Sequence, residues 1–230
     1  HDVRRQPARV RRSIAVTGQF AAVDDLLTGR ENLAMFAKLE RVPRRRLRAR
    51  TDEMLERFGL ADAADRRVRG YSGGMQRRLD LAISMLTRPR VLFLDEPTTG
   101  LDPRSRFEVW RFVRDLAGGG VTILLTTQYL EEADQLADRV VLLDGGRVVA
   151  EGSPTELKRG VGTEIVHIEY SDGRRENLPT DGSFTGVRDA MAGVAAPHDV
   201  TAVELRAPSL DDVFLSLTGT GTKYSEGVSS

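Results

Sequence analysis

Several features are absent from this 230-residue sequence, and each absence narrows what the protein can be. The chain has no cysteine. This absence suits a cytosolic protein, but it only weakly excludes other compartments. No apolar run approaches the roughly 18 residues that a membrane helix needs, and no signal peptide opens the chain. We therefore expect no membrane-spanning segment, so that any role at a membrane comes through a partner.

Neither sign of charge is in excess. Lys plus Arg and Asp plus Glu each number 34, so the formal net charge is zero, which argues against a nucleic-acid partner. A loop of the form Gly-x-x-x-x-Gly-Lys-Ser/Thr, whose amides and lysine cradle the phosphates of a nucleotide, is also missing. The chain begins at His1 rather than at a methionine.

The most informative stretch that is present covers residues 91–102, Val-Leu-Phe-Leu-Asp-Glu-Pro-Thr-Thr-Gly-Leu-Asp. Its four apolar residues predict a strand of a parallel sheet, buried on both faces. Ligands of open α/β sheets bind at the carboxyl ends of strands. There, Asp95 can hold Mg²⁺ and Glu96 can orient or deprotonate an attacking water. An ordinary strand end with two solvated acids is the alternative that this stretch leaves open by itself.

A second motif lies about twenty residues upstream. Ser72, Gly73 and Gly74 precede an apolar pattern with helical spacing, Leu79, Ala82, Ile83 and Leu86. Two glycines at a helix start leave backbone N–H groups open to a phosphate, and the helix dipole favours an anion there. Ser72 can cap the helix or donate its hydroxyl to a phosphate oxygen. A Ser-Gly-Gly alone is a common loop; the strand ending in Asp-Glu-Pro that follows makes this pair of motifs specific.

Together these motifs resemble the nucleotide-binding subunit of an ABC transporter. Ser72-Gly73-Gly74 match the signature motif of that family, residues 91–96 its Walker B strand and residues 100–102 its D-loop. The residues around the signature motif and the run 125–134, Leu-Thr-Thr-Gln-Tyr-Leu-Glu-Glu-Ala-Asp, resemble drug exporters of the daunorubicin-resistance type. The resemblance covers roughly residues 1–158. In the family the phosphate-binding loop, or Walker A, precedes the part that matches His1, so we expect an incomplete N-terminus; a degenerate protein is the alternative.

The resemblance implies an α/β fold: a partial P-loop NTPase with a parallel core sheet and a helical subdomain, followed by a small α+β extension. We predict a nucleotide-binding domain over residues 1–159, with the helical subdomain at about 28–88. An accessory domain over 160–219 and a flexible tail over 220–230 follow. Within the helical subdomain, Thr28 and Glu31 have the spacing of a capping box. Its arginines at 41–50 suggest nucleic acid or lipid headgroups, or a solvated helix face beside acidic neighbours.

Two glutamines complete the site that the resemblance implies. Gln19 follows a short strand predicted over 13–19 and matches the Q-loop residue, thought to touch Mg²⁺ and the attacking water. Gln128 stands where most of these ATPases carry a histidine; its amide can donate a hydrogen bond but cannot become cationic. Asp102 is well placed as a helix N-cap before Pro103, and in the family it also meets the opposing subunit.

The sequence after the expected core carries no catalytic pattern. Asp144-Gly145-Gly146 predicts a hairpin turn, and Ser153 to Glu156 form a capping box. Strands are expected over 164–170 and 200–206, with a turn at 171–174, a weak helix around 187–194 and a capped helix over 209–219. Packing or a dimer contact is the role that we expect for this last helix.

The resulting hypothesis is an ATP-hydrolysing subunit that drives drug efflux through a separate membrane permease, from the cytoplasmic face of the membrane. ATP and Mg²⁺ lie between two copies of the subunit: Asp95 and Gln19 serve the metal, and Glu96, Gln128 and Gln19 the hydrolysis. Ser72, Gly73, Gly74 and Asp102 bind ATP, partly across the dimer. Two alternatives remain: an inactive fragment acting as an interaction module, and a soluble ABC protein with no transport role.

Overall fold

The computed structural model describes residues 1–18, 22–161, 164–194 and 199–218. The chain divides into two compact units, His1–Gln128 and Tyr129–Ser230. The predicted tail over 220–230 lies outside the described residues, and the predicted domain boundary at 159 stays a prediction. None of the helices in the described ranges is both long enough and apolar enough to cross a bilayer.

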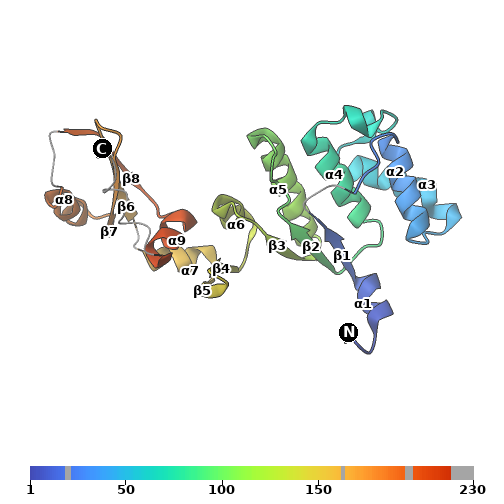
Figure 1. Ribbon diagram of the computed structural model, residues 1–230, viewed down its shortest axis with the longest axis horizontal. Coiled ribbons are helices and arrows are strands. Elements are labelled where there is room, and N and C mark those ends of the chain that lie inside the picture. The colour runs from blue at the N-terminus through green and yellow to red at the C-terminus, as the bar shows by residue number, and fades with distance from the viewer. Residues whose placement is uncertain (19–21, 162–163, 195–198, 219–230) are drawn as a thin grey trace, which may run out of the picture. The chain divides into compact units, whose positions relative to one another are not determined.

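The first unit is an α/β domain whose elements are drawn from blue to green in Figure 1. Along the chain they are α1 (Pro7–Ser13), β1 (Ile14–Thr17), α2 (Gly29–Leu39), α3 (Arg44–Arg57), α4 (Gly73–Ser84), β2 (Val91–Asp95), α5 (Pro103–Gly118) and β3 (Thr122–Thr126). Short 3₁₀ turns at Ala61–Ala63 and Val68–Gly70 join α3 to α4. The sequence predicted the strands and the helices from α2 onward, but not α1.

The three strands form a parallel sheet in the order β1-β2-β3, so the strand that carries Asp95 is central. Ile14 pairs with Val91, and Asp95 pairs with Thr126. Because all three strands run the same way, their carboxyl ends lie at one edge of the sheet. The predicted parallel core sheet is confirmed, and its register decides which side chains meet at that edge.

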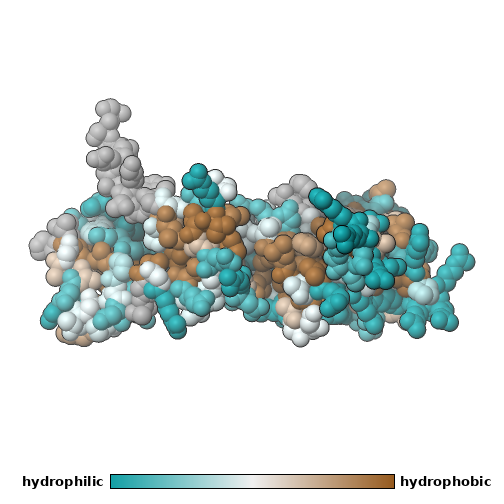
Figure 2. All heavy atoms as spheres, turned by 90° about the horizontal axis from the view of Figure 1, so that it is seen from below, coloured by the Kyte–Doolittle hydropathy of each residue, from teal (hydrophilic) through white to brown (hydrophobic). Residues whose placement is uncertain are grey.

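The two faces of this sheet are buried to different extents in the described chain. On one face Leu92 and Leu94 are buried, and the hydroxyls of Thr17 and of Ser84 on α4 lie 2.6 Å apart. On the other face Val16 and Leu124 are 66% and 57% exposed; Figure 2 shows apolar side chains at the surface in brown. The expectation of a strand buried on both faces is therefore met only in part: Leu92 and Leu94 of β2 are buried, whereas Val91 and Phe93 on its other face are half-buried.

Local capping explains where the helices of the first unit begin. Thr28 and Glu31 form the predicted capping box, with both reciprocal hydrogen bonds, at the start of α2. The arginine-rich α3 exposes most of its arginines, as expected for a solvated helix face. Arg50 is the exception: it is 8% exposed, donates to the carbonyls of Met85 and Leu86 and pairs with Glu53. It thus ties α3 to the C-terminal end of α4.

Gly29, the first residue of α2, is a position where a side chain cannot fit. A Cβ there would collide with the Tyr71 hydroxyl, which donates to the Ala63 carbonyl at 2.7 Å. We expect Gly29→Ala to lower the free energy of unfolding by about 1–3 kcal/mol in urea titrations, the usual cost of overpacking. In a Tyr71→Phe background the same change should cost less, because the hydroxyl oxygen is gone.

The matched control is Gly118→Ala at the end of α5, where a Cβ meets no atom of the described chain within 4 Å. This change should be neutral or stabilising by up to about 1 kcal/mol, since alanine loses less backbone entropy on folding. Equal effects of the two substitutions would contradict the close packing of Gly29 against Tyr71.

The second unit contains a hairpin, a small sheet and four helices in its described part. Its elements are α6 (Leu130–Leu136), β4 (Val140–Asp144), β5 (Arg147–Gly152), α7 (Pro154–Arg159), β6 (Glu164–Tyr170), β7 (Arg175–Thr180), α8 (Phe184–Ala192), β8 (Val200–Arg206) and α9 (Leu210–Thr218). Strands β4 and β5 form the predicted antiparallel hairpin, and the other strands form an antiparallel sheet in the order β7-β6-β8. The sequence missed β7.

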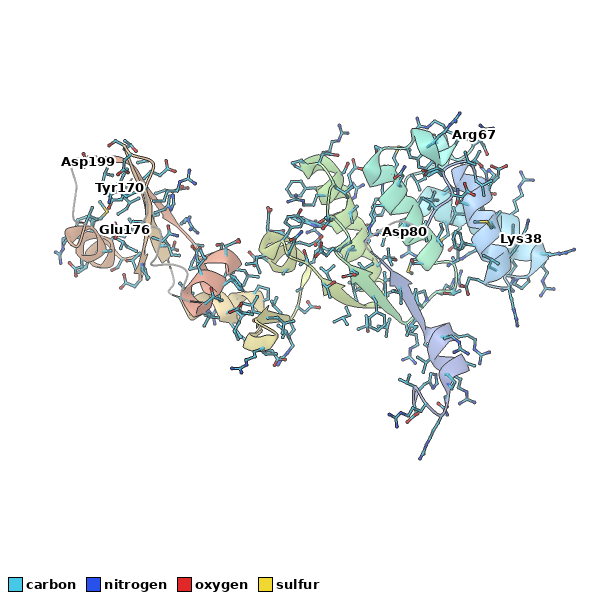
Figure 3. All side chains as sticks on the ribbon, viewed as in Figure 1. Lys38, Arg67, Asp80, Tyr170, Glu176 and Asp199 are labelled. Carbon is cyan, nitrogen blue, oxygen red and sulfur yellow. The ribbon has the colours of Figure 1, made fainter. Side chains whose placement is uncertain are left out.

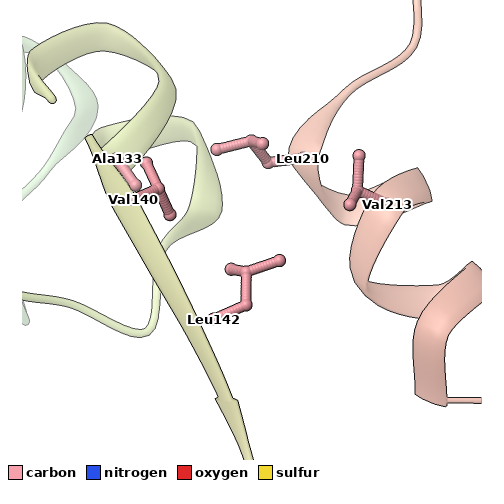
Figure 4. Close-up of a cluster of buried hydrophobic side chains, with 5 residues drawn as sticks. All are labelled: Ala133, Val140, Leu142, Leu210 and Val213. Carbon is pink, nitrogen blue, oxygen red and sulfur yellow. The ribbon is translucent and has the colours of Figure 1, made fainter. Parts of the chain in front are cut away.

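Helix α9 packs against the elements at the start of this unit. Leu210 and Val213 are buried with Ala133, Val140 and Leu142 in one apolar cluster (Figure 4). The helix is held by a further capping box, in which Asp212 accepts from the backbone N–H of Ser209 at 2.8 Å. Asp212 also accepts two hydrogen bonds from Arg206 on β8. Packing is therefore one role of the last helix.

Candidate functional site

The candidate site lies at the edge of the first sheet where its strands end. The register places Gly18, Asp95 with Glu96, and Thr126 with Gln128 beyond or at the ends of β1, β2 and β3. This is the position expected of a ligand site in an open parallel sheet. Gln19, the next residue after Gly18, lies outside the described residues.

Asp95 is the exposed end of the central strand. Its Oδ1 accepts a short hydrogen bond from the Thr126 hydroxyl on the neighbouring strand, which fixes the carboxylate at the sheet edge. Within the described ranges no group of three or more His, Cys, Asp or Glu side chains is arranged to hold a metal by itself. Mg²⁺, however, usually keeps several waters and takes one or two carboxylates plus substrate phosphates. The Asp95 carboxylate and the Thr126 hydroxyl offer hard oxygen ligands of the kind that Mg²⁺ prefers.

Glu96 has an unusual backbone. Its φ is +43°, in the left-handed region, which costs a residue with a Cβ about 1–2 kcal/mol. The N–H of Glu96 donates to the Thr126 carbonyl at 2.9 Å, and the Thr99 hydroxyl donates to its Oε2 at 2.8 Å. The Gln128 amide approaches the same oxygen at 3.5 Å, a weak contact. Oε2 is thus held from two sides, and Oε1 is the carboxylate oxygen that neither Thr99 nor Gln128 contacts in these bonds.

The glycine-lined helix start is formed as predicted. Ser72 is the N-cap of α4, and its hydroxyl oxygen accepts from the Met75 N–H at 3.3 Å. That bond uses a lone pair of the hydroxyl and leaves its proton available to an acceptor. Ser72 and Gly73 are exposed, whereas Gly74 is buried. The 12-residue helix therefore begins at the surface at Ser72 and Gly73, and an anion is favoured at such a helix start.

Gly74 is buried because α5 begins directly against it. A Cβ at Gly74 would lie 2.6 Å from Ser105 Oγ and 2.7 Å from Ser105 Cβ. Asp102 is the N-cap of α5, and its carboxylate accepts from the Ser105 N–H at 3.0 Å and from its hydroxyl at 2.6 Å. These bonds hold the pKa of Asp102 below its ordinary value. The structure thus joins Gly74 to Asp102 through Ser105.

The predicted residues fall into two groups of contacts: Asp95, Glu96 and Gln128 at the sheet edge, and Ser72 to Gly74 with Asp102 where α4 and α5 begin. Sequence reasoning missed Thr99, Ser105 and Thr126. Thr126 closes a strand beside that of Asp95, and Ser105 is at the N3 position of a capped helix. Thr126 can therefore be identified once the strand order is known, and Ser105 once the cap of α5 is known. Nothing in the sequence pattern singles out Thr99.

Comparisons with known proteins show which family the chain resembles. A family described as ABC transporter matches residues 1–99. The daunorubicin resistance ATP-binding protein DrrA3 of Streptomyces coeruleorubidus is 49% identical, over 98% of this chain and 78% of its own length. The daunorubicin/doxorubicin resistance ATP-binding protein DrrA of Streptomyces peucetius is 47% identical, over 95% and 74%. The Nod factor export ATP-binding protein I of Ralstonia nicotianae is 37% identical, over 92% and 72%.

A solved structure shows a similar fold. It is cbiO1 from Clostridium perfringens, described as part of the ABC transporter complex cbiONQ. It superposes with a TM-score of 0.59 at 27% sequence identity, covering 67% of this chain and 64% of that one.

Proposed function

This chain belongs to the ATP-binding proteins of ABC transporters, an ATPase family, and we propose that it couples ATP hydrolysis to export through a separate membrane permease. The observation that carries this proposal is the acidic pair at the end of β2. Asp95 is held by Thr126 from the next strand, and Glu96 is held by Thr99 in a left-handed conformation. Strain of this kind persists where the surrounding structure enforces it, which is common at active sites.

Each residue has a chemical role in this proposal. Bound Mg²⁺ would neutralise phosphate charge, and Asp95, Thr126 and Gln19 are the side chains that we assign to it. Glu96 accepts the proton of the attacking water, or orients that water, through the carboxylate oxygen that Thr99 does not hold. Gln128 donates its amide N–H toward the γ-phosphate or the water. Phosphoryl transfer then relies on positioning and charge neutralisation rather than on covalent catalysis.

The second half of the site is proposed to come from a twin subunit. The N–H groups at the start of α4 and the Ser72 hydroxyl are donors for phosphate oxygens, whereas Asp95 and Glu96 are acceptors for a metal and a water. A two-fold pairing would place the donors of one copy opposite the acceptors of the other, with ATP between them. Asp102, bound to Ser105 beneath the donors, would join this interface.

The names of the relatives suggest the cargo. Proteins similar to this chain are named for resistance to daunorubicin and doxorubicin, and others for export of Nod factor. We propose efflux of a drug or antibiotic, with this subunit at the cytoplasmic face of the membrane and bound there through the permease. We expect no nucleic-acid partner in that role.

The proposal is tested by purifying the complete protein from its native membrane and measuring Mg²⁺-dependent ATP hydrolysis. We expect co-purification with a small integral membrane protein, and drug sensitivity when either gene is deleted. Co-purification with ribosomes or DNA would instead favour a non-transport ABC protein. A complete protein that neither binds nor hydrolyses ATP would reduce the chain to an interaction module.

A further inference from the structure

A buried arginine on α4 connects the signature helix to the strand ends. Arg77 is 5% exposed, one turn after the glycines that begin the helix. Its Nε donates to the Pro97 carbonyl at 2.8 Å, and a terminal nitrogen lies 3.4 Å from the Asp95 carbonyl. These two carbonyls lie on either side of Glu96, whose φ is +43°. One guanidinium therefore holds the main chain on both flanks of the strained residue.

The same guanidinium reaches the loop after β1. Its other terminal nitrogen donates to the Gly18 carbonyl at 2.7 Å and to Asp80 Oδ2 at 3.2 Å. Asp80, which Figure 3 labels on α4, is 4% exposed, and its Oδ1 accepts from the Ala22 N–H at 3.2 Å. Burial raises the pKa of Asp80, although the Ala22 N–H and the Arg77 charge act in the opposite direction. The ion pair thus bonds the main chain at Gly18, at Ala22 and on both sides of Glu96.

We propose that Arg77, neutralised by Asp80, is a positioning residue that holds Glu96 in its left-handed conformation at the sheet edge. This rests on the proposed function, in which Glu96 acts on the attacking water. Burying two charges is costly, and replacing such a pair by apolar residues is often neutral or stabilising. A buried pair is therefore weak evidence for a role in stability alone. The planar fork of arginine can bind several acceptors at fixed angles, which lysine cannot reproduce.

The test compares Arg77→Lys with a matched control, Arg50→Lys, in the complete protein. Arg50 is also buried on a helix, α3, and it also donates to two carbonyls and pairs with an acid. Its two carbonyls, however, lie at the C-terminal end of α4, away from the glycines at which that helix begins. Both variants keep the positive charge, and both should lower Tm. We expect Arg77→Lys alone to lower kcat for ATP, by about 10- to 100-fold, because small displacements of a catalytic group have effects of this size. KM should change little.

A second variant covers the case in which Arg77→Lys does not fold. In Arg77→Gln/Asp80→Asn the buried charges are gone and a hydrogen-bonding group remains at each position. Its kcat should again fall while its Tm stays near that of the wild type. Wild-type kcat in a folded Arg77 variant, or an equal loss of kcat in Arg50→Lys, would overturn the assignment. If the wild type itself hydrolyses no ATP, the proposed function fails instead, so the two failures are distinguishable.

Discussion

Glu96→Gln is expected to leave ATP binding intact and to reduce ATP hydrolysis by about 10²- to 10⁴-fold, the usual contribution of a general base. Glutamine has nearly the same shape and can still accept the hydrogen bond that Thr99 donates to Oε2. It cannot take a proton from water, because an amide oxygen is a very weak base. The measurement is single-turnover hydrolysis of Mg²⁺-ATP by the complete protein. Because hydrolysis reopens the proposed dimer, size-exclusion chromatography with ATP should show an accumulated dimer.

Glu108→Gln is the control for this variant. Glu108 is on α5, in the same unit, and pairs with Arg78 and Arg104 rather than with any residue assigned to the site. We expect a small loss of stability there and an unchanged rate of hydrolysis. A normal rate of ATP hydrolysis in Glu96→Gln would contradict the proposed role of Glu96. It would also contradict the proposal that the end of β2 is a hydrolytic site.

Gly74→Ala is expected to reduce the rate of ATP hydrolysis about 100-fold, because it disturbs the close packing between the start of α4 and the start of α5. The added Cβ would lie 2.6 Å from Ser105 Oγ, and Ser105 is itself bonded twice to Asp102. Turning the Ser105 hydroxyl away would break its bond to Asp102 and would still leave the Ser105 Cβ 2.7 Å from the added Cβ, so the start of α4 must move instead. Its N–H groups would then lose their aim at a phosphate, and displacements near 1 Å cost about this much in rate.

Two comparisons make this second prediction specific. Gly73→Ala should have a smaller effect, because its Cβ would meet only the flexible end of Leu101, at 3.2 Å. Gly74→Ala/Ser105→Gly should recover activity, since the Ser105 Cα is 3.5 Å from the added Cβ, an ordinary contact. A double variant as inactive as Gly74→Ala would show that the alanine acts by some route other than this contact.

Mixing the two inactive proteins extends the test to the twin subunit. If each ATP lies between the acids of one copy and the glycines of the other, a mixed dimer of Glu96→Gln and Gly74→Ala has one intact site. Random pairing should then restore up to roughly a quarter of the wild-type rate, because half of the dimers are mixed and each has one of two sites. No recovery would contradict the shared site.

The helix starts were predictable because capping is a local property. Thr28, Ser72 and Asp102 each bond to a backbone N–H three residues later, so a few adjacent residues specify the geometry. The hairpin at 144–146 is local in the same way. The missed β7 follows the predicted turn at 171–174 and pairs with β6 as a hairpin, but its proline and its weak alternation give no clear strand signal.

The rest of the candidate site could not be predicted because it depends on strand pairing across long stretches of chain. Thr126 bonds to Asp95 only because β3 lies beside β2 in a particular register. Arg77 reaches Gly18, Asp95 and Pro97 because the sheet brings the ends of β1 and β2 beneath α4. Neither contact leaves a periodicity or a spacing in the sequence.

By itself the sequence determined the family, the two motifs and the local starts of the helices, since these depend on residue identity within a few positions. Only the tertiary structure decided that Glu96 is left-handed, that Gly74 rests on Ser105 and that Arg77 bonds to the flanks of Glu96. The reason is physical: a strained backbone or a close contact costs free energy, and it persists only when segments distant in the sequence pack together and supply the bonds that offset this cost.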